Sequence, residues 1–213
     1  MTQIPDDLNL FMACFEPNKA AFAPPPAGIT LRPCRKDELP FWLALPFDDL
    51  GSAAENEGNM AAFFQRVYAP KGNLFFETCL VAADADDEPL GSCFVWEAYG
   101  CLQTLHWLKV KKGFEGLGIG RALISGALRG VLPEAYPVCL HTQPGSFRAI
   151  KLYSDFGFQF LTDEVIGTRR NDLRACLPLL KEQMPGEAFR ALLFCSAAKG
   201  ILRALEREAE PEF

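Results

Sequence analysis

Cysteines at metal-ribbon spacing are missing from this 213-residue sequence. Eight cysteines occur, but no two of them form a C-x-x-C pair. Zinc ribbons need such pairs, so the sequence predicts no metal site. Most of the cysteines stand among apolar neighbours, as Cys79 and Cys139 do, which is typical of buried, unpaired thiols in a reducing compartment.

An excess of basic residues and a long apolar run are missing as well. Lys and Arg number 21 against 27 Asp and Glu, which gives a net charge of -6. Nucleic-acid binding depends on clustered cations, so this composition argues against a nucleic-acid partner. No apolar run reaches the roughly 18 residues of a membrane span, and residues 2–7 do not look like a secretion signal. We therefore expect a cytoplasmic protein without a nucleic-acid or membrane partner.

Three regions are distinguished along the chain. Residues 1–28 contain three consecutive prolines at 24–26, which neither a helix nor a central strand accommodates, and are predicted to form an N-terminal leader segment. Residues 29–170 alternate helical and extended patterns and predict one domain. Residues 171–213 predict a C-terminal extension of two or three short helices, divided at Pro178, Pro185 and Gly186. Its apolar stripe, Ala188 to Leu193 with Ile201 to Leu205, is expected to pack on the domain, with a dimer contact as the alternative.

The central region predicts an α/β (α+β) fold: a mixed, mostly antiparallel sheet of about six to seven strands with helices on both faces. The strand ending at Val110 and the strand ending at Thr142 are expected to pair in parallel, joined by a right-handed helical crossover. The predicted strands cover 29–33, 73–82, 89–99, 101–110 and 136–142, with another from 158. The predicted helices cover 35–45, 59–68, 117–130 and 146–156, and 48–59 is expected to be a loop.

A glycine-rich loop stands between the strand ending at Val110 and the next helix. It reads Glu115-Gly116-Leu117-Gly118-Ile119-Gly120. Glycine backbone can approach a phosphate closely, and the first N–H groups of a helix favour an anion. The alternative is a turn that only lets helix and strand pack closely. A Walker A loop is excluded because no Gly-Lys-Ser/Thr occurs, and the spacing does not fit the dinucleotide fingerprint G-x-G-x-x-G.

Two segments together resemble one known family. The loop and the following Arg121-Ala122-Leu123-Ile124 are similar to the acetyl-CoA loop of GNAT acetyltransferases, with Glu115 at a place where that family usually has Gln or Arg. Residues 146–158, Ser-Phe-Arg-Ala-Ile-Lys-Leu-Tyr-Ser-Asp-Phe-Gly-Phe, resemble the later family signature, with Ser146 in place of Asn. The resemblance covers about residues 29–168. Lys111, Lys112 and Arg121 are expected to offset the charge of Glu115.

The resemblance implies an N-acetyltransferase that moves an acetyl group directly from acetyl-CoA to an amine within one ternary complex. Tyr153 matches the family tyrosine that protonates the departing thiolate, although it can instead be an aromatic residue packed on its helix. The implied acceptor is a small-molecule or peptide amine, and the chain is expected to be a monomer or homodimer. The residues expected to bind the cofactor are Leu108, Lys109, Val110, Glu115, Gly116, Leu117, Gly118, Ile119, Gly120, Arg121 and Ser146.

The general base has several candidates. Alternation along the strand places His106 on one face with Thr104 and Leu108, and the pKa class of histidine suits proton acceptance near neutrality. Glu97 on the preceding strand is the other side-chain candidate, and a water molecule is a third possibility. His141 is expected to line the acceptor pocket. Two further functions stay open: an acyl-CoA sensor or scaffold without transfer activity, which the substitution at Glu115 favours, and a different nucleotide-binding enzyme.

Overall fold

The computed structural model describes residues 8–197, 205 and 212, and divides the chain into two compact units. Unit 1 takes its described residues from Met1–Ala21, Glu97–Thr104 and Leu132–Phe213, and unit 2 consists of Phe22–Trp96 and Leu105–Val131. Strands β4 and β5 contribute residues to both units. Each unit is therefore described by itself.

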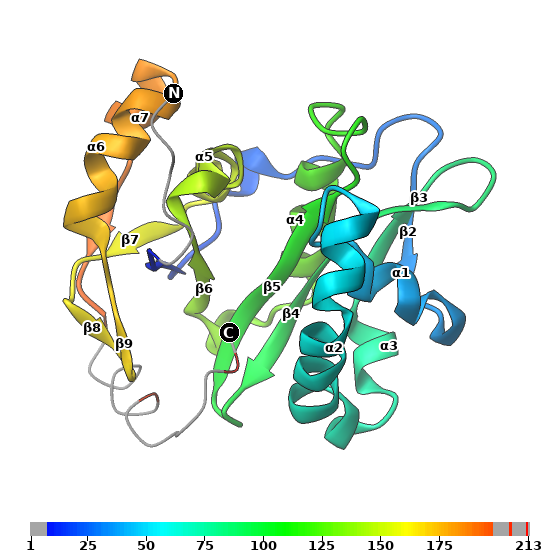
Figure 1. The fold of residues 1–213 in the computed structure, drawn as a ribbon. Helices are drawn as coiled ribbons and strands as arrows, with labels where there is room; N and C mark the ends of the chain where they lie inside the picture. Colours follow the sequence, from blue (N-terminus) through cyan, green and yellow to red (C-terminus); the bar gives the residue numbers. More distant parts are fainter. Residues whose placement is uncertain (1–7, 198–204, 206–211, 213) are drawn as a thin grey trace. The chain divides into compact units, whose positions relative to one another are not determined.

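Unit 2 contains the glycine-rich loop and the elements around it (Figure 1). Its strands pair in the order β5-β4-β3-β2, and β3 is antiparallel to both of its neighbours. The loop joins the end of β5 to helix α4. The strands are β2 Thr30–Pro33, β3 Leu80–Ala83, β4 Pro89–Ala98 and β5 Leu102–Val110. The helices are η2 Lys36–Glu38, α1 Leu39–Ala44, α2 Leu50–Val67, η3 Ala69–Lys71, α3 Leu74–Thr78 and α4 Ile119–Arg129.

Helices cover both faces of the unit 2 strands. Val81 of β3 belongs to an aromatic-rich core together with residues of α1, α2 and α3. The neighbouring Leu80 points to the opposite face. There, a Cβ added at Gly126 of α4 would stand 2.9 Å from Leu80 Cδ1, so α4 packs closely against this face. Side chains that alternate along β3 therefore pack against α1, α2 and α3 on one face and against α4 on the other.

Unit 1 is built around strand β1, Leu10–Cys14, whose five residues are all buried. This strand is antiparallel to β6 on one side and to β7 on the other. Strand β10 adds to β7 in parallel, and β6 runs parallel to the start of β5. The other strands are β6 Val138–Thr142, β7 Gln159–Leu161, β8 Val165–Ile166, β9 Arg169–Arg170 and β10 Phe194–Cys195. The helices are η1 Lys19–Ala21, η4 Pro133–Ala135, η5 Pro144–Ser146, α5 Phe147–Asp155, α6 Leu173–Gln183 and α7 Gly186–Arg190.

The predicted sheet type is confirmed, with more strands than expected. Hydrogen-bonded neighbours follow the order β10-β7-β1-β6-β5-β4-β3-β2, which makes an open, mixed sheet of eight strands rather than six to seven. A separate pair consists of β8 and β9. The parallel pairing of β5 with β6 agrees with the predicted crossover.

Several predicted elements are wrong for identifiable reasons. Helix α2 begins at Leu50, where a loop was expected, because the Asp49 side chain accepts a hydrogen bond from Ser52 N and caps the helix. Residues Leu74–Thr78 form α3 instead of the first half of a strand. The predicted leader contains β1, whose buried faces leave no polar alternation to read. Pro178 lies inside α6 rather than between helices. Ile201 and Leu202 of the predicted stripe lie outside the described residues.

The cysteines agree with the expectation of buried, unpaired thiols. All eight are free, and only Cys101 is exposed, while Cys195 is partly buried. Burial raises the pKa of Cys14 and of Cys139 to about 12, so both thiols stay protonated at neutral pH. Within the described part of the chain, no three or more His, Cys, Asp or Glu side chains gather as a metal site would require. None of the described helices has the length and apolar character needed to cross a bilayer.

Candidate functional site

The glycine-rich loop turns sharply between β5 and α4. Gly113, Gly116 and Gly118 have φ values of +97°, +79° and +87°, a conformation that other residues rarely adopt. Gly118 is the N-cap of α4, so the free N–H groups of the first helical turn follow the last of these glycines. The loop therefore presents backbone donors at the positive end of an 11-residue helix.

The space around the glycines of the loop is open. Residues 112–118 are all exposed. A Cβ added at Gly116 would meet no atom within 4 Å, and one added at Gly118 would meet only Pro26, at 3.5 Å. The glycines are therefore not explained by close packing of protein against the loop. This geometry fits an anion that occupies the space a side chain would fill, and α4 itself is anchored beneath by the buried Ile119.

Cationic side chains stand on either side of the loop. Lys111 lies with its ammonium group 5.2 Å from the centre of the Phe41 ring. Lys109 pairs with Asp48 at 2.6 Å, and this bond lowers the pKa of the Asp48 carboxyl. Lys112 is exposed, and Arg121 is partly buried in the first turn of α4. The side chain of Glu115 is exposed, and its expected compensation by Lys111, Lys112 and Arg121 stays a prediction.

The last part of β5 departs from regular strand geometry. Trp107 has φ +50°, a left-handed value inside a strand, whereas the other described non-glycine residues with positive φ stand in connections. Such a conformation interrupts the alternation that placed His106 and Leu108 on one face. Next to it, β4 comes close to the end of β5: a Cβ added at Gly91 would stand 2.7 Å from Lys109 O. The backbone of residues 108–110 is thus positioned by the turn at Trp107, which precedes it, and by the adjacent strand β4.

His106 lies inside the aromatic core of unit 2. It is 4% exposed, its Nδ1 is 2.5 Å from the Tyr68 hydroxyl, and its ring packs against Phe94. Burial lowers the pKa of His106 to about 3. A neutral imidazole with so low a pKa is a weak proton acceptor. The surroundings of His106 therefore speak against the predicted role of general base.

The other predicted catalytic residues lie in unit 1. Tyr153 stands on α5 with 7% exposure, and its ring centre is 5.9 Å from that of Phe158. Ser146 is the N-cap residue of α5 and is exposed, but its side chain makes no capping hydrogen bond. Glu97 is exposed at the end of β4. The meeting of these side chains with the loop of unit 2 stays a prediction.

The side chain of His141, in unit 1, contacts Asn9 and Phe11. Its Nε2 lies 2.8 Å from Asn9 Oδ1, and its ring centre is 5.1 Å from that of Phe11. Burial first, and then the charge of Arg169, lower the pKa of His141 to about 3. The expected place of His141 in an acceptor pocket stays a prediction.

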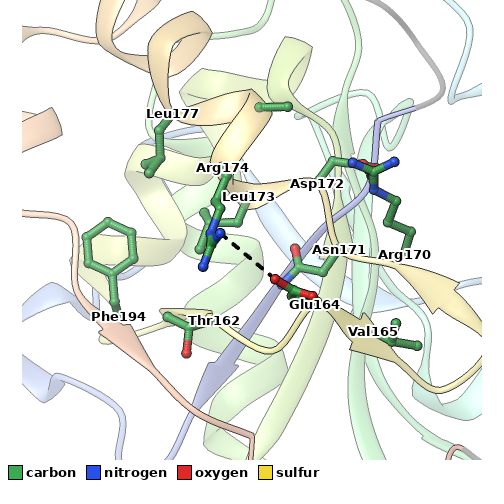
Figure 2. Close-up of a pocket in the computed structure, with 11 residues that line it drawn as sticks. Thr162, Glu164, Val165, Arg170, Asn171, Asp172, Leu173, Arg174, Leu177 and Phe194 are labelled. Carbon is green, nitrogen blue, oxygen red and sulfur yellow. Dashed lines mark ion pairs between the residues drawn. The ribbon is translucent and has the colours of Figure 1, made fainter.

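A surface cavity of about 720 Å³ lies in unit 1 (Figure 2). It is bounded by Thr162, Glu164 and Val165, by residues 170–172 and the start of α6, and by Phe194 of β10, and none of the predicted site residues lines it. Its charged groups pair with one another: Arg170 with Asp172 at 3.0 Å, and Arg174 with Glu164 at 3.9 Å across the cavity. The cavity therefore shares no lining residue with the predicted cofactor site.

Three features near the loop were not anticipated from the sequence. Gly91, Trp107 and Tyr68 shape the end of β5, yet none belongs to either family motif. Gly91 carried one signal, because a glycine inside a strand marks a bulge or a close backbone approach. The conformation of Trp107 and the partners of Tyr68 depend on tertiary contacts and left no local signal.

Comparison with known proteins supports the resemblance. Residues 76–160 match the family model described as acetyltransferase (GNAT) domain. A search of curated proteins found no match. Among solved structures, a GNAT-family acetyltransferase from Colwellia psychrerythraea has a TM-score of 0.50 at 12% identity, over 72% of this chain and 53% of that one. This likeness shows a shared fold.

Two further structures are similar over shorter or partial alignments. A GCN5-related N-acetyltransferase from Sphaerobacter thermophilus is 23% identical, with a TM-score of 0.47, over 63% of this chain and 42% of that chain. A transcriptional regulator from Bacillus halodurans is 18% identical, with a TM-score of 0.43, over 59% and 89%. The chain thus spans about two fifths to half of the two acetyltransferases. Residues 76–160 therefore match a GNAT acetyltransferase domain, and the chain shares the fold of a GNAT-family acetyltransferase.

Proposed function

We propose that this chain is an acetyl-CoA-dependent N-acetyltransferase that transfers the acetyl group directly to an amine in a ternary complex. The observation that carries the proposal is the exposed segment 115–118, whose positive-φ glycines Gly116 and Gly118 lead into the N-terminus of α4 with open space at Gly116. Acetyl-CoA would supply the acetyl group, which it carries as a thioester. Its diphosphate would be the anion that the loop binds. The loop would hold that diphosphate through backbone N–H groups.

The chain's own residues would orient the donor and manage protons. Backbone groups of Leu108 to Val110 would hold the pantetheine arm, since β4 and the turn at Trp107 position this segment. The amine nitrogen would form a bond to the acetyl carbon as the carbon–sulfur bond breaks. The hydroxyl of Tyr153 would give its proton to the departing thiolate sulfur. Ser146 would make a polar contact with the cofactor.

The proton that leaves the amine needs an acceptor. The burial and low pKa of His106 make it unsuitable. Glu97 is exposed and carries a carboxylate, so we propose Glu97, directly or through a water molecule, as the acceptor. The amine acceptor is proposed to be a small molecule or a peptide, and the chain to act as a monomer or homodimer.

An assay of coenzyme A release tests the proposal. The protein is mixed with acetyl-CoA and a panel of amines that includes polyamines, amino acids and peptides, and the free thiol is measured against a control without amine. We expect amine-dependent release for at least one class. Binding of coenzyme A without release for any amine would instead support the sensor or scaffold, which the carboxylate of Glu115 favours.

A further inference from the structure

One buried hydroxyl bridges two consecutive side chains of β5. Trp107 Nε1 donates to Tyr68 Oη at 2.9 Å, and His106 Nδ1 lies 2.5 Å from the same oxygen. Tyr68 is 0% exposed and is the C-cap of α2. The hydroxyl therefore connects the end of helix α2 to strand β5 within unit 2.

The direction of the two hydrogen bonds follows from the chemistry of the groups. An indole N–H only donates, so the Tyr68 oxygen accepts from Trp107. Because burial keeps the pKa of His106 at about 3, its ring is neutral at pH 7 and one of its nitrogens accepts. Tyr68 then donates its own hydrogen to His106 Nδ1, and the imidazole proton stands on Nε2.

The shared partner is possible only because the strand is interrupted. In a regular strand, consecutive side chains point to opposite faces and do not reach the same atom. His106 and Trp107 both reach Tyr68 Oη because Trp107 has φ +50°. A left-handed backbone at a bulky residue is unfavourable and persists only where surrounding contacts hold it. The bonds of the Tyr68 hydroxyl are contacts of this kind.

The interrupted position directly precedes the segment assigned to the cofactor. Residues 108–110 follow Trp107, and the carbonyl of Trp107 is held from the other side by Ser92 Oγ at 3.4 Å. We propose that Tyr68 is a positioning residue for coenzyme A: its hydroxyl holds the turn at Trp107 and so sets the backbone of 108–110. This inference rests on the proposed function. His106 serves Tyr68 as a hydrogen-bond acceptor and is not the general base.

Replacing only the hydroxyl tests the inference. In Tyr68→Phe, the ring and its packing stay while both bonds are lost, so we expect coenzyme A to bind about tenfold more weakly. The KM for acetyl-CoA should rise by the same factor, while kcat stays within about twofold. Tyr136→Phe is the matched control, because the Tyr136 hydroxyl is also buried but has no hydrogen-bond partner among the residues that the structure describes. This control should bind coenzyme A as the unaltered protein does.

Two substitutions of His106 separate positioning from base catalysis. His106→Asn keeps an acceptor oxygen near the place of Nδ1 and should retain affinity and turnover within about twofold. His106→Leu removes the Nδ1 acceptor of the Tyr68 hydroxyl and should weaken coenzyme A binding about tenfold. If both variants instead lost turnover alike and bound coenzyme A normally, His106 would be the base, and its proposed role would be refuted.

The outcomes for the unaltered protein keep the two proposals apart. If it binds no coenzyme A by calorimetry, the proposed function fails and the positioning role fails with it. If it binds coenzyme A, and Tyr68→Phe and His106→Leu bind it equally tightly, only the positioning role is refuted. Should Tyr68→Phe lose its fold by circular dichroism, the comparison of His106→Asn with His106→Leu decides.

Discussion

At the scale of single residues, the candidate site depends on places where a side chain is missing. Gly116 and Gly118 adopt a backbone that L side chains rarely take, and Gly116 faces open space. Open space alone does not require glycine, but open space combined with a helix N-terminus fits a bound anion. The same loop carries an exposed carboxylate, Glu115, which must turn away from a diphosphate or be offset by nearby cations.

A valine at Gly118 tests this interpretation. We expect Gly118→Val to abolish measurable coenzyme A binding, since its side chain would stand where the diphosphate approaches the first turn of α4. Gly113→Val is the matched control: Gly113 has a similar φ of +97° and open surroundings, but lies before the motif. Calorimetry should show loss of binding only for Gly118→Val. Equal affinities of the two variants for coenzyme A would contradict the loop assignment.

The proposed role of Tyr153 is tested by removing its hydroxyl. Tyr153→Phe keeps a ring that is 7% exposed and packs near Phe158, so the fold should persist. Without a proton donor for the thiolate, kcat should fall by about 100-fold, within the range of general acid catalysis, while coenzyme A affinity changes less than threefold. Steady-state kinetics and calorimetry give the two values. An equal loss in both quantities would assign Tyr153 a packing role.

At the scale of elements, the close approach of β4 to the end of β5 positions the cofactor segment. In Gly91→Ala, the new Cβ would stand 2.7 Å from Lys109 O and 3.1 Å from Val110 Cα, so backbone must move. We expect a loss of about 1–3 kcal/mol in the free energy of unfolding, together with weaker coenzyme A binding. Urea unfolding and calorimetry measure the two effects.

Another glycine serves as the control for that substitution. Gly58 lies in α2, and a Cβ added there meets nothing within 4 Å. Gly58→Ala should therefore increase the free energy of unfolding by about 0.5–1 kcal/mol through helix propensity. If Gly91→Ala proved as stable as the unaltered protein, the tight packing of β4 on residues 109–110 would be disproved.

The elements that local patterns predicted are those with clear periodicity or capping residues. Helix α4, strand β6 and helix α5 were anticipated closely. Strand β1 was missed because a fully buried strand has no alternation, and its neighbours β6 and β7 lie far away in the sequence. Helix α3 was taken for a strand because its aromatic residues have high strand propensity, which tertiary packing overrides.

At the scale of the whole molecule, the two histidines make stability depend on pH. In the folded protein the pKa of His106 and of His141 is lowered to about 3 by burial, whereas the unfolded chain takes up these protons near pH 6.5. Between these pH values the unfolded state binds more protons than the folded state. The contribution of the two neutral histidines to the free energy of unfolding is therefore fully present above pH 6.5 and is lost as the pH decreases toward 3. For His106 the loss is about 1.4 kcal/mol for each pH unit in this window.

Urea unfolding at pH 7.5 and pH 5.5 checks this expectation. The free energy of unfolding should be lower at pH 5.5 by about 1 kcal/mol or more. In His106→Asn the difference should shrink, because the sequence contains only two histidines and one of them is then absent. Equal stability of the unaltered protein at both pH values would show that these rings are not held neutral.

Only those parts of the candidate site that consist of residues contiguous in the sequence were predicted. The loop at 115–121 and the segment at 146–158 could be read from the sequence because each motif is local. The surroundings of His106 could not, since they bring together residues from α1, α2, α3 and β4 through tertiary packing. Alternation alone suggested an accessible base, and the aromatic core supplied the burial that argues against it.

Binding of coenzyme A compared with pantetheine tests the central claim most directly. Pantetheine keeps the thiol arm but lacks the diphosphate, so a loop that holds the diphosphate should bind coenzyme A at least tenfold more tightly. Calorimetric titration of the full chain with each compound measures this ratio. Equal affinities, or no binding of coenzyme A at all, would contradict the assignment of the glycine-rich loop.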